Sequence, residues 1–344
     1  HNDVIRYMKV GNQIMATIQD VAKMAGVSVA TVSRVLNNSA SVVESTRENV
    51  MNAIKKLNYE PNLLGRNLRR SETKMVLVLL PNISNPFYSR IVKGIEDVGH
   101  KNGYNVMLCN TDSDREREKI YLEMLKKKLS DGVIFMAPEL SKDELSEIGA
   151  NFPVVQCCEY KEGADVSHVS IDNLQASYKA MRHLIGLGHR RIGFISCKNN
   201  FLSIKQREEG YRKALEESGL PYDRELIQYG DYSFKSGLRA AKQMLAMKDQ
   251  PTAIFSISDI MAIGTLRAVR ENGLAVPDDI AIVGFDNISF SSMCDPRLTT
   301  VSQPKYDLGC AAMELLIRQI KGDMKEPRDI FMEHELIIRE STLK

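Results

Sequence analysis

The segment 18–37 reads IQDVAKMAGVSVATVSRVLN, and its second half has helical spacing. The larger apolar residues fall on one side of that helix, whereas Val29, Ala30, Ser33 and Arg34 fall on the other. A helix fits the major groove of a DNA duplex, where arginine can bond guanine and small apolar side chains can contact thymine methyl groups. The spacing therefore indicates a face suited to reading base edges, but by itself it also fits a small helical bundle with scattered polar residues.

Hydroxyl and amide side chains flank this face. Thr17, Thr31 and Asn37 are suited to hydrogen bonds with phosphate oxygens, which fix the register of a protein on a duplex. Ser28, which we expect to cap the second helix, completes the predicted DNA-binding set of this segment.

The residue spacings that carry catalytic chemistry are missing. The sequence has no GxxxxGK[ST], HExxH or GxSxG motif, and Gly186-Leu187-Gly188 lacks the third glycine of a dinucleotide-binding loop. Six cysteines are spread without a CxxC pair or the spacing of a zinc site. We therefore expect no enzyme activity, no cofactor and no metal site, and we expect reduced thiols in a cytoplasmic protein.

Three short helices are predicted to carry the DNA-reading face. Thr17 and Asp20 form a capping box at the start of the first helix, and a glycine ends it. Ser28 can cap the second helix, and Ser45 with Glu48 is expected to open the third with another capping box. Two short helices joined by a tight glycine turn and followed by a third are typical of a helix-turn-helix domain.

Beyond residue 74, predicted strands alternate with predicted helices. The expected strands are 75–80, 105–109, 132–136, 191–196, 253–257 and 280–285, and the expected helices are 86–102, 114–129, 173–187, 205–217, 233–246 and 259–271. Such alternation predicts parallel sheets with helices on both faces, and a segment of this length predicts two lobes. Ligands bind beyond the carboxyl ends of such strands, where two facing lobes would form a cleft that closes on its ligand. The acidic run 112–118 is expected to be a solvated helix start.

Charge is distributed unevenly along the 344 residues, of which 43% are hydrophobic and 26% charged. Residues 1–71 carry ten Lys and Arg against five Asp and Glu, whereas the remaining residues carry 36 against 39. A basic head on a slightly acidic body indicates a polyanion-binding module joined to a second module. No apolar run approaches the roughly 18 residues of a membrane span, and we recognise no secretory signal, so we expect no membrane partner.

The headpiece segment and several motifs behind it resemble the lactose/galactose repressor (LacI/GalR) family of bacterial transcription regulators. The resemblance extends over nearly the whole chain from residue 15 and includes Gly65-Arg66-Asn67, Asn85-Pro86-Phe87-Tyr88 and Cys294-Asp295-Pro296. It implies a small all-α helix-turn-helix headpiece and an α/β two-lobed core with parallel sheets, similar to the type I periplasmic binding proteins. It also implies a homodimer on a pseudo-palindromic operator in double-stranded DNA. Within the family, the likeness to the cytidine-repressor branch implies a nucleoside or another sugar-like, pentose-containing effector.

The resemblance assigns the segment after Pro61 as a hinge. In the family this segment becomes helical on operator DNA, and Leu68 matches the leucine that wedges into the minor groove and bends the duplex. Arg66 and Arg69 can hold the DNA backbone on either side. Gly65 stands where many members have alanine, which costs about 1 kcal/mol of helix propensity and predicts a looser hinge. An ordinary basic linker is the alternative.

The resemblance also points to effector-binding residues in the body. A small polar ligand needs a flat stacking surface and a few fixed polar groups. The matched positions are Phe87, Tyr88, Arg207, Tyr232 and Asp286. Two further positions are Ser258, where several members have a ligand-binding asparagine, and Cys157, near where sugar-responsive members carry an aspartate. The absence of a carboxylate at Cys157 argues against a simple sugar. Each position alone also fits an ordinary role, such as a solvated arginine, a turn-forming aspartate or a core aromatic.

The predicted organisation follows from these motifs. The expected domains are an extension or cloning scar without periodicity at 1–14, a helix-turn-helix domain at 15–60, a hinge helix and linker at 61–73, and an effector-binding and dimerisation core at 74–344. The core is expected to comprise one lobe of about 74–170 and 304–330 and another of about 171–303 and 331–344. The predicted function is a sequence-specific DNA-binding regulator, a repressor, controlled by a small ligand between the lobes. The alternatives are a solute-binding protein of a transporter, which the helix-turn-helix disfavours, and a regulator controlled by a partner protein.

Overall fold

The chain forms two compact units, His1–Glu72 and Thr73–Lys344, which we describe separately. The structure is a computed structural model that describes residues 8–10, 13–36, 41–59, 72–324 and 326–343. Within these ranges, no helix has the length and apolar character needed to cross a bilayer.

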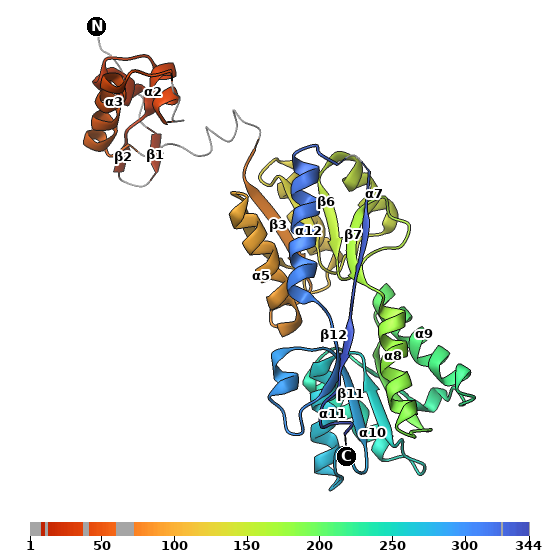
Figure 1. The fold of residues 1–344 in the computed structure, drawn as a ribbon. Coiled ribbons are helices and arrows are strands. Elements are labelled where there is room, and N and C mark those ends of the chain that lie inside the picture. The colour runs from red at the N-terminus through yellow and green to blue at the C-terminus, as the bar shows by residue number, and fades with distance from the viewer. Residues whose placement is uncertain (1–7, 11–12, 37–40, 60–71, 325, 344) are drawn as a thin grey trace. The chain divides into compact units, whose positions relative to one another are not determined.

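The first unit is built on three helices, drawn in red and orange in Figure 1. They are α1 (Ile18–Ala25), α2 (Val29–Leu36) and α3 (Glu44–Leu57). Each helix turns apolar residues inward, and Val21, Val32 and Val50 from the three helices are fully buried in one cluster. The three predicted helices of the headpiece are therefore confirmed.

Local side-chain hydrogen bonds start the first two helices as predicted. The backbone N–H of Asp20 donates to Thr17 Oγ1 (3.3 Å), and the N–H of Thr17 donates to Asp20 Oδ2 (2.8 Å). Ser28 Oγ accepts a hydrogen bond from the N–H of Thr31 (3.2 Å). The capping box predicted at Ser45 is wrong, because the N-cap of α3 is Val43, two residues earlier, and Ser45 already lies inside the first turn.

A short antiparallel hairpin precedes the headpiece helices. Strands β1 (Met8–Val10) and β2 (Gln13–Met15) pair with Met8 opposite Met15. No strand was predicted from sequence in residues 1–14, so this hairpin was missed.

The second unit contains two six-stranded sheets, each with its own helices. The first sheet has the order β13-β7-β6-β5-β3-β4 and is parallel throughout. Its strands are β3 (Met75–Leu80), β4 (Asn105–Asn110), β5 (Gly132–Phe135), β6 (Val154–Cys157), β7 (Ser167–Ile171) and β13 (Asp329–Met332). Its helices are α5 (Pro86–Lys101), α6 (Arg115–Lys126), α7 (Lys142–Asn151) and α12 (Lys305–Ile320). We call this sheet and its helices the first lobe.

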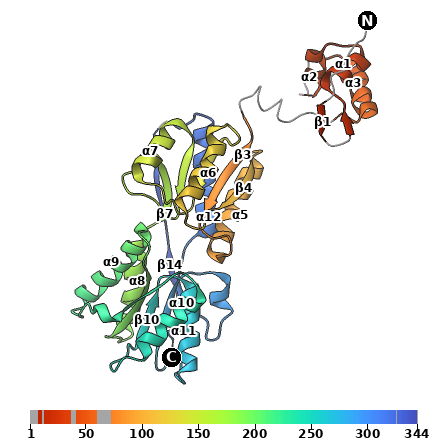
Figure 2. The same ribbon diagram turned by 180° about the vertical axis from the view of Figure 1, so that it is seen from behind.

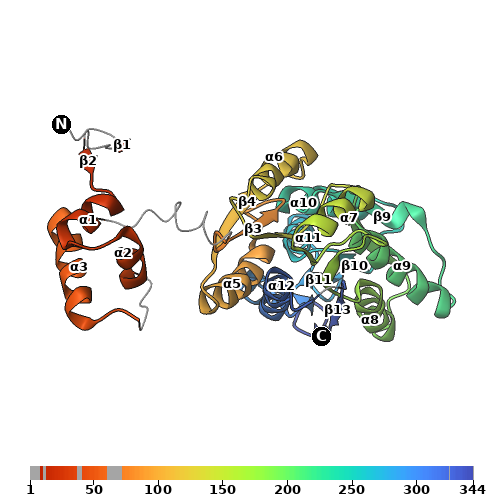
Figure 3. The same cartoon turned by 90° about the horizontal axis from the view of Figure 1, so that it is seen from above.

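The second sheet has the order β14-β12-β11-β10-β8-β9, and only the β12–β14 pair is antiparallel. Its strands are β8 (Ile192–Cys197), β9 (Ile227–Gly230), β10 (Ala253–Ser256), β11 (Ala281–Asp286), β12 (Thr299–Ser302) and β14 (Glu335–Ile337). Its helices are α8 (Asn173–Gly186), α9 (Leu202–Glu217), α10 (Phe234–Leu245) and α11 (Asp259–Glu271). Figure 3 shows helices of this unit on both sides of the strands, as the alternating pattern predicts. We call this sheet and its helices the second lobe.

The chain passes between the two lobes three times. Figure 2 shows the region of these connections from behind. The crossings follow β7, β12 and β13. Strand β13 pairs with β7 as far as Met332, so the first lobe extends two residues beyond the boundary expected near residue 330. Because the lobes share three connections, a change in their relative orientation requires bending at all three.

Several elements of the core were not predicted from sequence. Between residues 137 and 171 the structure forms α7, β6 and β7, and it also forms β9, β12, β13, β14 and α12. Strand β7 reads Ser-His-Val-Ser-Ile, which lacks an apolar run, yet every residue in it is buried. Its hydroxyls find partners, since Ser170 Oγ donates to the carbonyl of Cys158 (2.8 Å) and Ser167 Oγ accepts from the N–H of Arg328 (3.0 Å). Because these buried serines are hydrogen-bonded, a buried strand can contain them, and a search for apolar runs then misses it.

Candidate DNA-reading helix and ligand cavity

Helix α2 presents one exposed face and one buried face. Val29, Ala30 and Arg34 are exposed, and Ser33 is half-buried. The opposite face carries Val32 and Val35, which are buried in the headpiece core. The structure therefore brings the four residues predicted to read bases onto the side of α2 that faces away from the core.

The predicted phosphate-contacting hydroxyls are engaged in caps. Thr17 Oγ1 donates to Asp20 Oδ2 (2.7 Å), and the hydroxyls of Ser28 and Thr31 share a hydrogen bond (2.9 Å). These bonds hold the first turns of α1 and α2, so the hydroxyls are fixed relative to the exposed face of α2. Four further predicted DNA-binding residues lie outside the described residues: Asn37, Arg66, Leu68 and Arg69.

A cavity of about 330 Å³ lies in the second unit and is lined by residues of both lobes. Its lining residues follow the carboxyl ends of strands in both sheets, as the general rule for parallel sheets predicts. They are Pro81, Asn82, Asn85, Phe87, Tyr88, Asp112, Ser113, Met136, Ala137, Cys158, Glu159, Asn199, Phe201, Ser203, Arg207, Asp231, Tyr232, Asp286 and Gln303. Five of the seven predicted effector-binding residues are in this set, namely Phe87, Tyr88, Arg207, Tyr232 and Asp286.

The Asn85-Pro86 pair places the first aromatic residues of the cavity. Asn85 Oδ1 accepts the N–H of Phe87 (3.0 Å), and Pro86 occupies the first turn of α5, where its missing N–H costs nothing. Phe87 and Tyr88 then meet edge to face, with ring centroids 5.1 Å apart. Burial raises the pKa of Tyr88 well above its ordinary value, so its phenol is a neutral hydrogen-bonding group in the cavity wall.

Arg207 is fixed in place by three contacts. Its Nε donates to Asn173 Oδ1 (3.0 Å), and its Nη1 donates to the carbonyl of Ile257 (2.7 Å). Its guanidinium carbon lies 3.7 Å from the centroid of the Phe285 ring, a stacked cation–π arrangement. The side chain is buried apart from its place in the cavity lining, so it offers a preorganised donor there.

Asp286 is the buried carboxylate of the second lobe. It is 7% exposed, and Gln303 Nε2 donates to its Oδ1 (2.8 Å). Burial raises the pKa of Asp286 from 3.8 to about 6, while the charges of Arg207 and Lys305 and the Gln303 hydrogen bond oppose the rise. At neutral pH the group is mostly ionised and can accept hydrogen bonds from ligand hydroxyls.

Glu159 joins the two lobes and was missed from sequence. It follows β6 of the first lobe, and its Oε1 accepts the N–H groups of Leu202 (2.6 Å) and Ser203 (3.2 Å) at the start of α9 in the second lobe. A carboxylate at a helix N-terminus satisfies amides that have no partner within the helix. Burial raises the pKa of Glu159, opposed by these bonds and by Arg207.

Two predicted effector-binding residues are not in the cavity lining. Cys157 is fully buried within β6, and its Sγ points to the carbonyl of Leu308 (3.8 Å), whereas the next residue, Cys158, lines the cavity. Cys158 follows the end of β6 and has a positive φ of 73°, so the cavity is lined by the loop after the strand and not by the last residue of the strand. Ser258 is buried as the N-cap of α11, where its Oγ accepts the N–H of Met261 (3.4 Å).

A buried glutamate supports the first-lobe wall of the cavity. Glu118 on α6 is 1% exposed, and its carboxylate accepts the N–H groups of Glu139 (3.0 Å) and Leu140 (3.2 Å), in the loop that continues from the lining residues Met136 and Ala137. Burial raises the pKa of Glu118 to about 7, opposed by these amide bonds. The expectation that the run 112–118 is solvated is thus wrong at Glu118.

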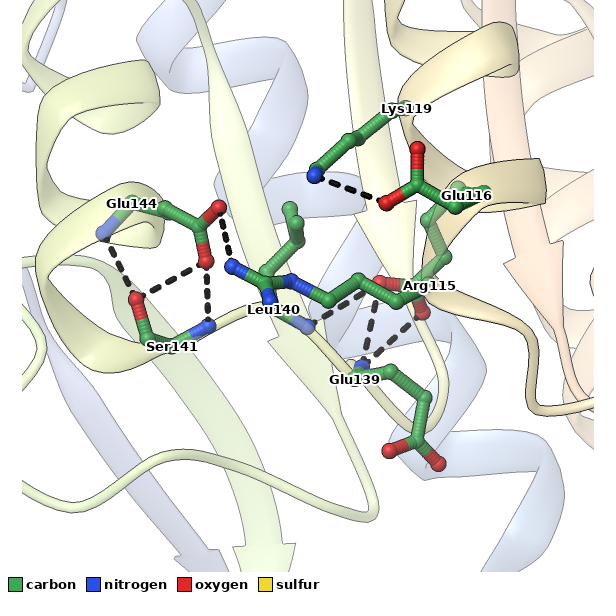
Figure 4. A network of polar contacts seen from close by, with 8 residues as sticks. Arg115, Glu116, Lys119, Glu139, Leu140, Ser141 and Glu144 are labelled. Atoms are coloured by element: carbon green, nitrogen blue, oxygen red, sulfur yellow. Dashed lines mark hydrogen bonds and ion pairs between the residues drawn. The ribbon is translucent and has the colours of Figure 1, made fainter.

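An ion pair next to this glutamate ties α6 to α7. Figure 4 shows Arg115 reaching Glu144 (2.6 Å), which also closes a capping box with Ser141 at the start of α7. These bonds and the Arg115 pair hold the pKa of Glu144 down to about 2. The loop between β5 and α7 is therefore braced from both helices.

The backbone is strained around the cavity. Five lining residues other than glycine have positive φ: Asp112 (54°), Ser113 (55°), Cys158 (73°), Tyr232 (65°) and Asp286 (106°). Such conformations cost of order 1–3 kcal/mol each and persist only where the surroundings hold them, which is common at ligand sites.

Sequence reasoning missed most of the polar lining. Asn82, Asp112, Asn199, Asp231 and Gln303 all lie just beyond a strand end. The rule that ligands bind beyond carboxyl ends could have found Asn82, Asp112 and Asn199, which follow predicted strands. Asp231 and Gln303 follow β9 and β12, which the sequence did not predict. Among the described residues, no three His, Cys, Asp or Glu side chains come together as a metal site requires.

Two family models match separate parts of the chain. Residues 17–62 match the lacI family of bacterial regulatory proteins, and residues 181–342 match the periplasmic binding protein-like domain. The chain is 43% identical over 336 residues to the HTH-type transcriptional regulator RegA of Clostridium saccharobutylicum, covering 96% of this chain and all of that protein. It is 39% identical to the HTH-type transcriptional repressor CytR of Escherichia coli K12, covering 95% of this chain and 96% of that repressor.

A solved structure supports the same relationship. The lac repressor dimer bound to operator and the anti-inducer ONPF is 29% identical to this chain, with a TM-score of 0.86, covering 96% of this chain and all of that one. The fold and these matches together define a DNA-binding transcription regulator with a ligand-binding core. The chain belongs to the lacI family of bacterial regulatory proteins. The match at residues 17–62 decides against the alternative of a transporter's solute-binding protein.

The buried charge of Asp286 makes a prediction about stability. The pKa of Asp286 in the folded protein is raised to about 6 from the ordinary value of 3.8. Its contribution to the free energy of unfolding is therefore fully present below about pH 3.8, where the group is protonated, and is lost as the pH rises through about 6. We expect Asp286→Asn to be more stable than the wild type near pH 8, by up to about 3 kcal/mol, with the difference closing toward pH 4. Urea unfolding of both proteins at several pH values measures it.

The exposed Asp278 provides the control. The free energy of unfolding of Asp278→Asn is expected to equal that of the wild type at every pH. Equal stability of Asp286→Asn and wild type near pH 8 would contradict the assignment of Asp286 as a destabilising buried charge.

Proposed function

We propose that this chain is a repressor whose affinity for operator DNA is set by a small, uncharged, hydroxyl-bearing ligand held in the cavity between the lobes. The observation that carries this proposal is the composition of the lining, which combines aromatic rings with several carboxylates and one guanidinium. In bacteria such a regulator acts in the cytoplasm, where the DNA is.

The charges of the cavity favour a neutral ligand over an anionic one. Asp112, Glu159, Asp231 and Asp286 line it, against Arg207 as the one cationic side chain in the lining set. Arg207 is already committed to Asn173 and Ile257 through two of its nitrogens. A phosphate group would be desolvated beside carboxylates, and like charges brought together in a partly dry site cost several kcal/mol.

The remaining groups suit a ring-bearing polyol such as a nucleoside. Tyr88, Tyr232 and Phe201 provide apolar faces and edges for a base. Asp286 can accept hydroxyl hydrogen bonds and Arg207 can donate them, which matches the needs of a ribose. The volume of about 330 Å³ falls in the range of about 300–1,000 Å³ typical of small-molecule sites.

Ligand binding controls DNA binding through the relative orientation of the lobes. Glu159 already bonds α9 across the cavity, so a ligand that fills the same space favours one lobe orientation over another. The resulting difference in free energy biases the hinge segment 61–73, and by linkage operator DNA biases ligand affinity equally.

The ligand class is testable with matched pairs of compounds. We expect a nucleoside or pentose to raise the melting temperature of the purified chain, and we expect its monophosphate to bind at least about 10-fold more weakly, because the phosphate meets carboxylates. Thermal-shift screening followed by calorimetry measures both. Asp286→Ala is expected to lose the ligand response and keep operator binding, whereas Asp278→Ala, on the exposed surface, keeps both.

Two outcomes would contradict this assignment. One is tighter binding of the monophosphate than of the neutral parent. The other is the absence of any response to nucleosides, pentoses or hexoses, together with recovery of a protein corepressor from cell extract, which would favour control by a partner protein.

The exposed face of α2 is proposed to read the operator. Arg34 projects from that face, and arginine bonded to guanine is the commonest specific contact in the major groove. We expect Arg34→Ala to relax base preference at one operator position, a loss of about 1–3 kcal/mol of discrimination. Competition binding against a set of singly substituted operators measures it. An unchanged preference at every position would show that Arg34 does not read a base.

A second copy of the chain is proposed to cover an apolar groove of the second unit. The groove is lined by Ser84, Pro86, Phe234, Ile260, Ile263, Phe290, Met293 and Cys294, which we call the Phe290 patch. Phe290 is 56% exposed and Met293 72% exposed, which is unusual for large apolar side chains unless they are covered by a partner. The similar lac repressor structure is a dimer, and a two-fold dimer matches a pseudo-palindromic operator.

Sedimentation velocity tests this interface. Met293→Asp is expected to convert a dimer to a monomer and to weaken operator binding, because a buried unpaired charge opposes association. Leu187→Asp changes an apolar side chain that is 47% exposed at the end of α8, away from the Phe290 patch, and is expected to remain a dimer. A dimeric Met293→Asp variant would exclude this surface as the interface.

A further inference from the structure

The first residue of α12 is a lysine with a largely buried ammonium group. Lys305 Nζ donates to the backbone carbonyl of Asn287 (2.9 Å) and to that of Asp286. Lys305 lies where the chain crosses from β12 of the second lobe to α12 of the first, so it connects the start of a first-lobe helix to the end of strand β11. Lys305 was not among the residues predicted from the sequence or from the family resemblance.

The turn that Lys305 bonds has an unfavourable backbone conformation. Asp286 and Asn287 have consecutive positive φ values of 106° and 47°. Other groups hold the far side of this turn: Arg339 Nη2 donates to Asn287 Oδ1 (2.8 Å), and the N–H of Ile288 donates to Asp259 Oδ2 (2.9 Å). The two carbonyl oxygens of the strained residues are bonded by Lys305, whose positive charge makes these bonds stronger than neutral ones.

Charged and titratable groups from several elements lie near Asp286. Arg207 from α9 and Lys305 from α12 favour its ionised form, while burial disfavours it. Asp259 from α11 and Glu159 from the first lobe are further carboxylates nearby, and Arg90 from α5 faces Lys305. Two cations therefore oppose the effect of burial on Asp286. Arg207 is already held by Asn173, Ile257 and the Phe285 ring. Lys305 is the other one.

We propose that Lys305 is a positioning residue of the ligand cavity, whose ammonium group holds the Asp286–Asn287 turn and keeps the Asp286 carboxylate negatively charged and directed into the cavity. The importance of this role for regulation rests on the proposed function, in which Asp286 binds the effector. The role itself concerns the ligand-free protein and is measured there.

Carbon-13 NMR of the Asp286 carboxyl group tests the proposal without a ligand. The chain is labelled at aspartate Cγ, and the resonance is assigned by its loss in Asp286→Asn. In the wild type the titration midpoint is expected at about 6. In Lys305→Met it is expected to rise by about one pH unit, because losing a nearby positive charge disfavours the ionised carboxylate. Lys305→Arg, which keeps the charge, is expected to titrate close to the wild type.

Two further variants separate charge from packing. The side chain of Lys305→Gln can still donate to a carbonyl but carries no charge. The titration midpoint of Asp286 in this variant is therefore expected to rise as in Lys305→Met. If Lys305→Met does not fold, Lys305→Gln provides the test. Lys321→Met makes the same change at the exposed end of α12 and is expected to leave the Asp286 midpoint unchanged.

A wild-type midpoint in folded Lys305→Met or Lys305→Gln would overturn the proposal, and so would a midpoint in Lys305→Arg as high as in Lys305→Met. These outcomes are distinct from a failure of the proposed function. A cavity that binds no nucleoside or sugar would refute the ligand assignment and leave the Asp286 titration as it is.

Discussion

The meeting of two parallel sheets at one cavity is the constraint on which the rest of this structure depends. In a parallel sheet all strands end at the same edge, so each strand delivers its next residue to one place. Here both sheets deliver those residues to a shared space, which gathers Asp112, Glu159, Asp231, Asp286 and Gln303 from distant parts of the chain. The chain crosses between the lobes three times, so one lobe cannot turn relative to the other without bending all three connections.

Several polar groups and backbone conformations at the cavity between the lobes reduce the stability of the fold. Glu159 spans the lobes as the cap of α9, Asp286 remains a buried carboxylate, and five lining residues hold positive φ values. Buried charges and strained backbone lower the free energy of unfolding, and they persist where a ligand or a conformational change uses them. The proposed preference for a neutral ligand rests on such groups, since an unpaired anion would meet carboxylates that are already desolvated.

The three helices of the headpiece could be predicted from the sequence, whereas the cavity could be predicted only in part. Thr17 and Ser28 cap helices through bonds to residues three positions away, so a local pattern suffices to find them. The error at Ser45 arose because a capping motif fits more than one start position. Resemblance to a family located Arg207 and Asp286, but it placed the first-lobe contact on Cys157, the last residue of β6, whereas the cavity is lined by the next two residues, Cys158 and Glu159, which follow the end of that strand.

The sequence by itself determined the class of protein: a basic helix-turn-helix unit followed by an α/β core, because capping, helical periodicity and strand–helix alternation are encoded by near neighbours. Tertiary structure alone decided which polar side chains are buried, which of them meet, and how their charges are balanced. Glu118, Glu159 and Lys305 have nothing in their immediate sequence that sets them apart from solvated residues. Their roles arise because elements far apart in the chain remove water from around them and supply the amides and carbonyls that replace it.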